Sequence, residues 1–358
     1  MKFKLPLPAW TMVAPLVAWL LYFLSSLSSS NLFILLLTVS LMGSVMAAVH
    51  HAEVVAHRVG EPYGTLVLAI AVTVIEVSLI VSLMLSGGAD TATLARDTVF
   101  AAVMIILTGI IGLCLLIGGV HHHEQSFGPF GVNASLVTLM AITALTLILP
   151  NFTTSIKGPV YNESQLVFVA IISLVLYGTF VMVQTVRHRN YFLAPGTDED
   201  AHAEPPTAKT TLISAVLLLV CLGAVVLLAK TLAPSIEQGV ARLGAPKSMV
   251  GIIVALVILL PEGLAAFRAA RMNRLQTSLN LALGSALASI GLTIPAVAIV
   301  SVVTDIPVAL GIDTKSMVLL VLSLFTIVLS FGTGRTNILQ GVVLLVIFAV
   351  YLFTTIVP

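Results

Sequence analysis

Long apolar segments separated by short polar breaks run along the whole chain. A transmembrane helix needs roughly 20 predominantly apolar residues, and about eleven segments approach that length. Because the apolar runs are continuous rather than alternating, and because backbone polar groups in lipid must be paired internally, the pattern predicts helices and excludes an outer-membrane barrel. The expected spans are about 9–25, 31–57, 63–86, 97–119, 134–150, 165–186, 211–231, 248–267, 278–303, 316–331 and 336–356. The expected fold class is an all-α polytopic membrane protein.

Two of these segments contain a single carboxylate each. In "VTVIEVSLIV", Glu76 is the one charged residue, and "VALVILLPEGLAAF" places Glu262 in another apolar run. An ionised carboxylate at the centre of a membrane helix costs about 2.5–3.5 kcal/mol on insertion scales. Such residues are a functional-site hypothesis by default, although a satisfied hydrogen bond between helices is the alternative.

The composition is typical of a membrane protein and argues against other classes of protein, such as nucleic-acid-binding proteins. The 358 residues are 59% hydrophobic and 9% charged, with a formal net charge of +1, and no basic cluster with interleaved aromatic residues points to nucleic acid. The two cysteines, Cys114 and Cys221, both lie inside predicted spans. They are expected to be packing residues rather than a disulfide.

A hydrophilic segment divides the chain after the sixth span. The segment from Arg187 to Lys209 carries four acidic residues and is expected to be a solvated linker, with cation sensing as the alternative. The first span has the outline of a signal peptide but lacks an A-x-A-like site, so we expect a retained helix. The predicted organisation is an extra N-terminal helix (1–30), a first five-helix repeat (31–186), the acidic linker (187–209) and a second five-helix repeat (210–358).

Two repeats with an odd number of spans must have opposite orientations in the membrane. This 5+5 inverted-topology repeat is common in secondary transporters, which bind their ions near the membrane midplane. Glu76 and Glu262 each lie in the second helix of a repeat, and a faint alignment of the next helices pairs Asp97 with Asn280. A two-fold axis in the membrane plane would bring the two carboxylates together.

Positive charges in the loops predict the orientation, because Lys and Arg are retained on the cytoplasmic side. The loops on the side of the N-terminus hold more of them than the loops on the opposite side. We therefore expect a cytoplasmic N-terminus and linker and an outside C-terminus.

The chemistry expected of the two glutamates is shared binding of a cation and protons. Two facing carboxylates in a low-dielectric site need a counter-charge, and hard cations such as Ca²⁺ prefer carboxylate and carbonyl oxygens. Pro261 lacks an N–H and frees the carbonyl of residue 257 beside Glu262. Further oxygen ligands are expected from Thr73, Ser285 and Ser289, although such hydroxyls often bond their own helix instead.

Histidines near the cytoplasmic end of the second span suggest a proton pathway. "HHAEVVAHRVGEPYG" places His50, Glu53 and His57 on one helical face with His51 adjacent, and histidine titrates near neutral pH. The predicted pathway contains His51, Glu53, His57 and the two membrane glutamates. An ordinary polar helix end is the alternative.

Three stretches resemble a known family. "HAEVVAHRVGEPYGTLVLAIAVTVIEVSLI", "LPEGLAAFRAARMNRLQTSLNLALGSALASIGLTIP" and "FGTGRTNILQGVVLLVIFAVYLF" are similar to the ChaA-type bacterial calcium/proton antiporters of the calcium/cation exchanger superfamily. The resemblance implies that Glu76 and Glu262 are the cation-binding glutamates. It also implies efflux of Ca²⁺ across the bacterial inner membrane in exchange for H⁺, with Na⁺ and K⁺ as further substrates and no cofactor.

The chain also departs from the wider superfamily. Gly-Asn often precedes each glutamate by three and four residues, whereas this chain has Val72-Thr73 and Ile258-Leu259. Calcium coordination is therefore expected to be poorer in oxygen.

Two other functions are weighed against antiport. An intramembrane metal hydrolase is disfavoured because neither H-E-x-x-H nor H-x-x-E-H occurs. A cation channel, or an antiporter of monovalent cations, stays an alternative. The sequence leaves the oligomeric state open.

Overall fold

The computed structural model describes residues 7–25, 30–60, 63–87, 92–193, 205–242 and 244–357. The acidic residues of the predicted linker, Asp198, Glu199, Asp200 and Glu204, lie outside these residues. The first seven long helices and their irregular parts are α1 (Ala9–Leu24), α2 (Asn31–Val59), α3 (Tyr63–Gly87), α4 (Leu94–Met104) with η2 (Ile105–Ile110) and α5 (Ile111–His122), α6 (Pro129–Thr143) with η3 (Ala144–Ile148) and η4 (Leu149–Phe152), and α7 (Glu163–Met182) with η5 (Val183–Arg187) and η6 (Arg189–Tyr191). The rest are α8 (Ala208–Arg242), α9 (Ser248–Arg271), α10 (Leu275–Thr304), α11 (Thr314–Phe331) and α12 (Ile338–Ile356), with the short strands β1 (Glu124–Ser126) and β2 (Arg335–Asn337).

The predicted all-α polytopic membrane fold is confirmed. Within the described residues, ten helices are long and apolar enough to cross a membrane, whereas α1 has 16 residues and is shorter. Cys114 and Cys221 are free and buried, as expected of packing residues.

Two helix boundaries differ from the prediction by five residues or more. Helix α8 continues past the expected end at residue 231 and through Pro234 to Arg242, because Leu232, Ala233 and Val240 on the extension are buried by packing. Helix α6 begins at Pro129, five residues early, since proline is favourable at the first helical position.

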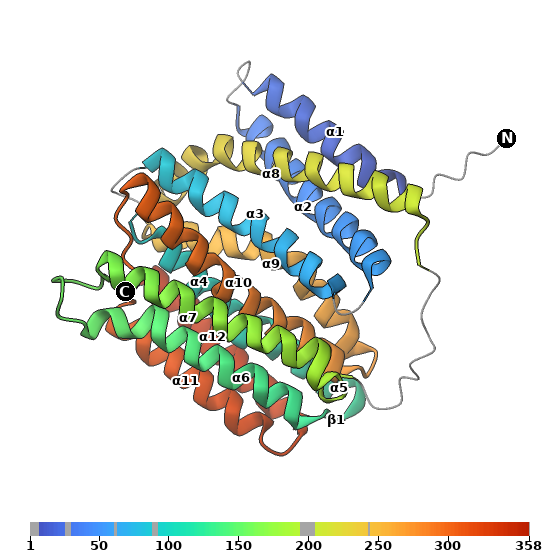
Figure 1. The fold of residues 1–358 in the computed structure, drawn as a ribbon, viewed down its shortest axis with the longest axis vertical. Helices are drawn as coiled ribbons and strands as arrows, with labels where there is room; N and C mark the ends of the chain where they lie inside the picture. Colours follow the sequence, from blue (N-terminus) through green and yellow to red (C-terminus); the bar gives the residue numbers. More distant parts are fainter. Residues whose placement is uncertain are drawn as a thin grey trace. The chain divides into compact units, whose positions relative to one another are not determined.

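The described chain forms two compact units. The first comprises Met1–Ser86 and Glu199–Lys247, and in it α1, α2 and α8 pack against one another (Figure 1). The Trp19 indole Nε1 donates a hydrogen bond to the carbonyl of Val220 at 3.1 Å. A Cβ on Gly223 would come within 3.1 Å of the same ring. Gly223 therefore allows the close approach of α1 and α8.

The second unit comprises Gly87–Asp198 and Ser248–Pro358. In this unit α9 packs against α4, α12 against α5, and α10 against α6, α7 and α9 (Figure 1). Helices α5 and α12 are in close contact at Gly341, where a Cβ would lie 2.5 Å from the backbone nitrogen of Leu116. Both units combine helices from the two predicted repeats, whose boundaries stay a prediction.

Short backbone pairings in the second unit join the two halves of the chain reciprocally. Strand β1 follows the third span of the first half, and it pairs with β2, which precedes the fifth span of the second half. Val160 precedes the fifth span of the first half, and it bridges to Ala309, which follows the third span of the second half. This exchange of roles is what a two-fold relation between the halves would produce.

The fifth span of each half begins with the same capping arrangement. In α7 the Asn162 side chain accepts from the backbone of Gln165, whose own side chain accepts from the backbone of Asn162. In α12 Asn337 and Gln340 form the same capping box. Both caps satisfy backbone N–H groups that a helix start leaves unpaired.

Candidate functional site

Glu76 lies in the apolar part of α3 with its side chain 2% exposed. Thr73 precedes it by three positions and therefore lies on the same helical face. The Thr73 hydroxyl oxygen is buried and has no hydrogen-bond partner among the described residues. This face of α3 thus presents a carboxylate and a hydroxyl oxygen.

Glu262 lies in α9, directly after Pro261, and is half-buried. The helix continues through the proline, which cannot donate to the carbonyl of Val257. Beyond the glutamate, a Cβ on Gly263 would meet the side chain of Ile110 at 3.2 Å. Glycine at this position therefore lets α9 lie close to the end of η2.

The η2 segment is a π-helix within the third span, and sequence reasoning missed it. The N–H of Ile111 bonds to the carbonyl of Ile106, five residues back. Thr108 in this segment is fully buried, and its hydroxyl donates to the carbonyl of Met104 at 2.5 Å. Single π-helical turns occur frequently at functional sites. No residue pattern identified this segment, because its neighbours are as apolar as those of an ordinary span.

The two predicted serine ligands lie in α10, which packs against α9. Ser285 is half-buried and Ser289 is 3% exposed. They are four positions apart and share a helical face. The second unit thus combines Glu262 with a neighbouring helix that carries two hydroxyls.

The residues of the predicted proton pathway have different surroundings within α2. The His51 ring is fully buried, and its Nε2 lies 3.1 Å from the carbonyl oxygen of Thr11 in α1. Glu53 and His57 are exposed near the end of the helix. Their exposure at the end of α2 agrees with an entrance to the predicted proton pathway. His51 instead contacts α1.

Glu76 and Glu262 belong to different units, and each is described within its own unit. Their predicted meeting stays a prediction. No group of three or more His, Cys, Asp or Glu side chains able to hold a metal ion occurs in the described ranges. Carboxylate, hydroxyl and freed carbonyl oxygens are nevertheless the ligands that hard cations prefer.

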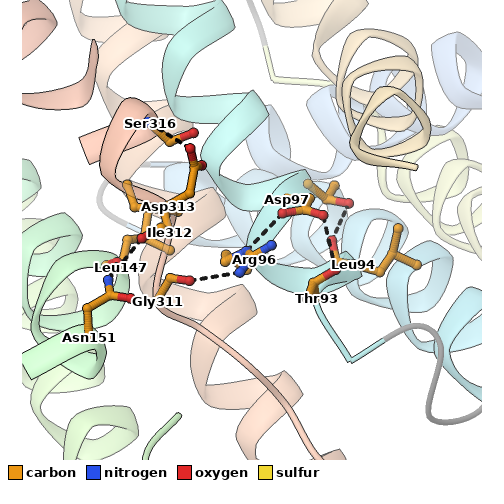
Figure 2. A network of polar contacts seen from close by, with 11 residues as sticks. Thr93, Leu94, Arg96, Asp97, Leu147, Asn151, Gly311, Ile312, Asp313 and Ser316 are labelled. Atoms are coloured by element: carbon orange, nitrogen blue, oxygen red, sulfur yellow. Dashed lines mark hydrogen bonds and ion pairs between the residues drawn. The ribbon is translucent and has the colours of Figure 1, made fainter. Parts of the chain in front are cut away.

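A polar network at the start of α4 was also missed (Figure 2). Arg96 donates to Asp97 Oδ1 at 2.8 Å, and the Thr93 hydroxyl donates to Asp97 Oδ2 at 3.2 Å. Arg96 also donates to the carbonyl of Gly311 at 2.8 Å. Asn151 donates to the carbonyl of Ile312 at 3.0 Å. The network joins α4, the end of the fourth span and the segment before α11.

Asn280, which the faint alignment paired with Asp97, takes part in a second network. Its side-chain nitrogen donates to the carbonyl of Phe192, and its side-chain oxygen accepts from Gln276 at 3.0 Å. Gln276 in turn accepts from the backbone N–H of Gly128 at 2.7 Å. Asn280 therefore bonds directly to the segment at Phe192, whereas Asp97 bonds Arg96, which in turn bonds the loop at Gly311.

Known proteins resemble this chain over most of its length. It matches the family described as "Sodium/calcium exchanger protein" over residues 29–186 and 213–357. It is 47% identical over 358 residues to y4hA of Sinorhizobium fredii, with 98% of this chain and 97% of that protein covered, and that name gives ionic transport as a provisional role. It is 38% identical over 324 residues to the sodium-potassium/proton antiporter ChaA of Escherichia coli, with 89% and 87% covered.

Solved structures share the fold. Native YfkE superposes with a TM-score of 0.77 at 17% identity, covering 98% of this chain and 100% of that chain. The H⁺/Ca²⁺ exchanger CAX superposes with a TM-score of 0.71 at 15% identity, covering 96% and 87%. The family match spans both halves of the chain. The chain belongs to the sodium/calcium exchanger family.

Proposed function

We propose that the chain is a cation/proton antiporter that exports Ca²⁺ in exchange for H⁺ by alternating access, with Na⁺ and K⁺ as further substrates. The observation that carries the proposal is the 38% identity to ChaA, a protein named for sodium-potassium/proton antiport. The burial of Glu76 within a membrane helix supports it. The Ca²⁺ component is supported by the similarity in fold to CAX, whose title names H⁺/Ca²⁺ exchange. In this proposal the chain is a secondary transporter and not an enzyme.

Glu76 and Glu262 are the proposed cation- and proton-binding groups. A carboxylate that holds a cation must first lose its proton, because the two positive charges compete for the same oxygens. If the empty, doubly charged state is too costly to cross the membrane, movement of the cation in one direction requires movement of protons in the other. Apparent cation affinity is therefore expected to weaken as the pH falls.

Neutral oxygens complete the proposed cation coordination. The unpaired hydroxyl of Thr73 supports its role as a ligand beside Glu76. Ser285 and Ser289 are proposed to act with Glu262, since α10 packs against α9. The Val257 carbonyl, which Pro261 cannot bond, is a further oxygen.

Protons are proposed to enter through the end of α2. Glu53 and His57 are exposed there, where their side chains can exchange protons with solvent. His51 belongs to the same proposed route, about half a turn before Glu53 and under two turns before His57. Substitutions of these residues should alter the pH profile of exchange without abolishing it.

The proposed location is the bacterial inner membrane, with the N-terminus in the cytoplasm and the C-terminus outside. The loop charges support this orientation. Single cysteines at position 200 and beside Pro358 test it, because the native cysteines are buried. Labelling of position 200 from outside would reverse the assignment of sides.

Everted membrane vesicles test the transport activity. A proton gradient that is acid inside the vesicles is dissipated by Ca²⁺, Na⁺ or K⁺ added outside if the chain exchanges that ion for H⁺. Vesicles that lack the protein give the background rate at which the cation dissipates the proton gradient. Cation uptake that follows the membrane potential and leaves the proton gradient unchanged would instead indicate a channel.

A further inference from the structure

Buried polar atoms without hydrogen-bond partners gather in α2 and α8 of the first unit. Among the described residues they are the hydroxyls of Ser40, Ser44 and Ser214, His50 Nε2 and His51 Nδ1. A buried polar group without a partner destabilises the folded state, because it has lost its hydrogen bonds to water. Native proteins satisfy nearly all such groups with protein atoms or ordered water. The presence of five such atoms in two helices that pack against each other therefore indicates a ligand with hydrogen-bonding capacity.

The His51 ring defines what this ligand must offer. Its Nε2 lies 3.1 Å from the Thr11 carbonyl oxygen, which can only accept a hydrogen bond. Nε2 therefore carries the ring hydrogen, and Nδ1 of the neutral ring is an acceptor. The ring is fully buried. The site thus requires a hydrogen-bond donor small enough to lie between packed helices.

Contacts between helices place Ser214 at the depth of His51. Arg58 at the end of α2 donates to the carbonyl of Pro206, just before α8, at 3.3 Å. With a rise of 1.5 Å per residue, His51 lies about 10 Å along α2 from Arg58, and Ser214 lies about 12 Å along the antiparallel α8 from Pro206. Both side chains are fully buried.

Ser44 extends the same polar face along α2. It lies seven positions before His51, which is two helical turns and returns to the same side of the helix. It is fully buried, and Ser40 lies one further turn away on this face. Helix α1 packs against both α2 and α8, so these hydroxyls line a region shared by three helices.

The charges nearby favour a neutral ligand. His50 is the adjacent titratable residue in α2, and the charged or titratable groups farther along it are Glu53, His57 and Arg58 at the exposed helix end. Helix α1 brings Trp10 and Thr11 beside the two histidines, and neither carries charge. In α8 the groups on either side of Ser214 are Lys209, which is exposed, and Cys221. No carboxylate faces His51 from α1 or α8, so a bound metal cation would lack a counter-charge.

We propose that α1, α2 and α8 hold a buried water molecule at His51, separate from the two membrane glutamates. The water donates to His51 Nδ1 and bonds the Ser214 hydroxyl, and further water along the Ser44 face continues the chain. The water joins α2 to α8, while the hydrogen bond of His51 to Thr11 joins α2 to α1. This assignment does not depend on the transport activity.

Solid-state NMR of the full chain in lipid vesicles tests the site directly. Joint isotope labelling of histidine and alanine selects two of the eight histidines, because only His51 and His202 precede an alanine. The His202→Gln variant then leaves His51 alone in the spectrum. We expect a neutral ring with its hydrogen on Nε2 and magnetisation transfer from water to Nδ1. A hydrogen on Nδ1, or an Nδ1 without water contact, would overturn the proposal.

Two matched variants in α8 locate the second partner of the water. Ser214→Ala removes the proposed partner, so water transfer to His51 Nδ1 should weaken. Thr231→Val is the control, because the Thr231 hydroxyl already donates to the carbonyl of Leu227 at 2.9 Å. Equal effects of the two variants, or no effect of Ser214→Ala, would show that Ser214 does not hold the water.

Discussion

Arg96 donates a hydrogen bond to the carbonyl of Gly311, 2.8 Å away, although 215 positions separate the two residues in the chain. The bond joins the start of the third span of the first half to the loop after the third span of the second half. Gly128 and Gln276 are related in the same way with the halves exchanged, at 2.7 Å. Long-range bonds of this kind hold the second unit together where its helices begin and end.

Removing the Arg96 charge should destabilise the second unit. In Arg96→Met, Asp97 keeps its carboxylate but loses its ion-pair partner, and the two side chains are only 18% and 16% exposed. Leaving a mostly buried polar group unpaired costs roughly 1–3 kcal/mol. We expect a lower midpoint of thermal unfolding in detergent, with partial recovery in the double variant that adds Asp97→Asn. If the decreases in unfolding midpoint of the two single variants simply add in the double variant, Arg96 and Asp97 do not interact directly.

Replacing either membrane glutamate should abolish exchange. Glu76→Gln and Glu262→Gln keep the shape of the side chain but cannot bind and release a proton. We expect intact folding by size-exclusion chromatography and no cation-dependent loss of the proton gradient in vesicles. Glu163→Gln, at an exposed helix start, is the control. Exchange above half of the wild-type rate in either membrane variant is incompatible with its proposed role.

Thr73→Val should weaken cation binding without stopping transport. The substitution keeps the branched shape and removes a buried hydroxyl that has no hydrogen-bond partner in the described part of the chain. Loss of one such oxygen contact, at about 1 kcal/mol, corresponds to roughly fivefold in apparent affinity. The cation concentration for half-maximal exchange measures it, with Ser78→Ala as control. An unchanged value for Thr73→Val would remove Thr73 from the ligand set.

Gly341→Ala should disrupt the contact between α5 and α12. The new Cβ would lie 2.5 Å from the Leu116 nitrogen and 3.0 Å from the Gly112 oxygen, and neither backbone atom can move independently of its helix. We expect a lower unfolding midpoint. Gly178→Ala is the matched control, because nothing lies within 4 Å of its added Cβ. A destabilisation of similar size in both would mean that helix contact is not the cause.

Tyr161 should make stability fall at high pH. Burial raises the pKa of its phenol from 10.0 to about 12, and the neutral hydroxyl donates to the carbonyl of Leu145 at 2.5 Å. Because the folded-state pKa is the higher one, this contribution is complete below pH 10 and is lost as the pH rises toward about 12. Tyr161→Phe should therefore flatten the decline of the unfolding midpoint above pH 10. The exposed Tyr191→Phe should leave that decline unchanged.

The number of apolar helices was predictable from the sequence because hydropathy alone determines which segments cross a lipid bilayer. The end of α8 was not predictable in this way, because buried residues such as Val240 continue the helix beyond its most apolar part. The faces of the helices were equally hard to assign. Residues that face lipid and residues that face another helix are both apolar, so no periodicity separates them.

In the candidate site, too, the sequence predicted features of composition but not features that depend on packing. Glu76 stood out because a carboxylate is rare in an apolar run, and its burial agrees with that expectation. The π-helical turn at Thr108 depends on packing and leaves no compositional trace. The position of His51 was hidden for a similar reason, because its partner is a backbone carbonyl of α1, which every residue type possesses.

The paired caps of α7 and α12 bear on how the chain is made. A helix that enters a membrane during synthesis cannot rely on residues that the ribosome has not yet added. Asn162 and Asn337 each form a capping box with a glutamine three residues later. Two of the backbone donors at each of these helix starts are therefore satisfied as soon as one turn has emerged. The last helix of each half can begin to form without waiting for a neighbour.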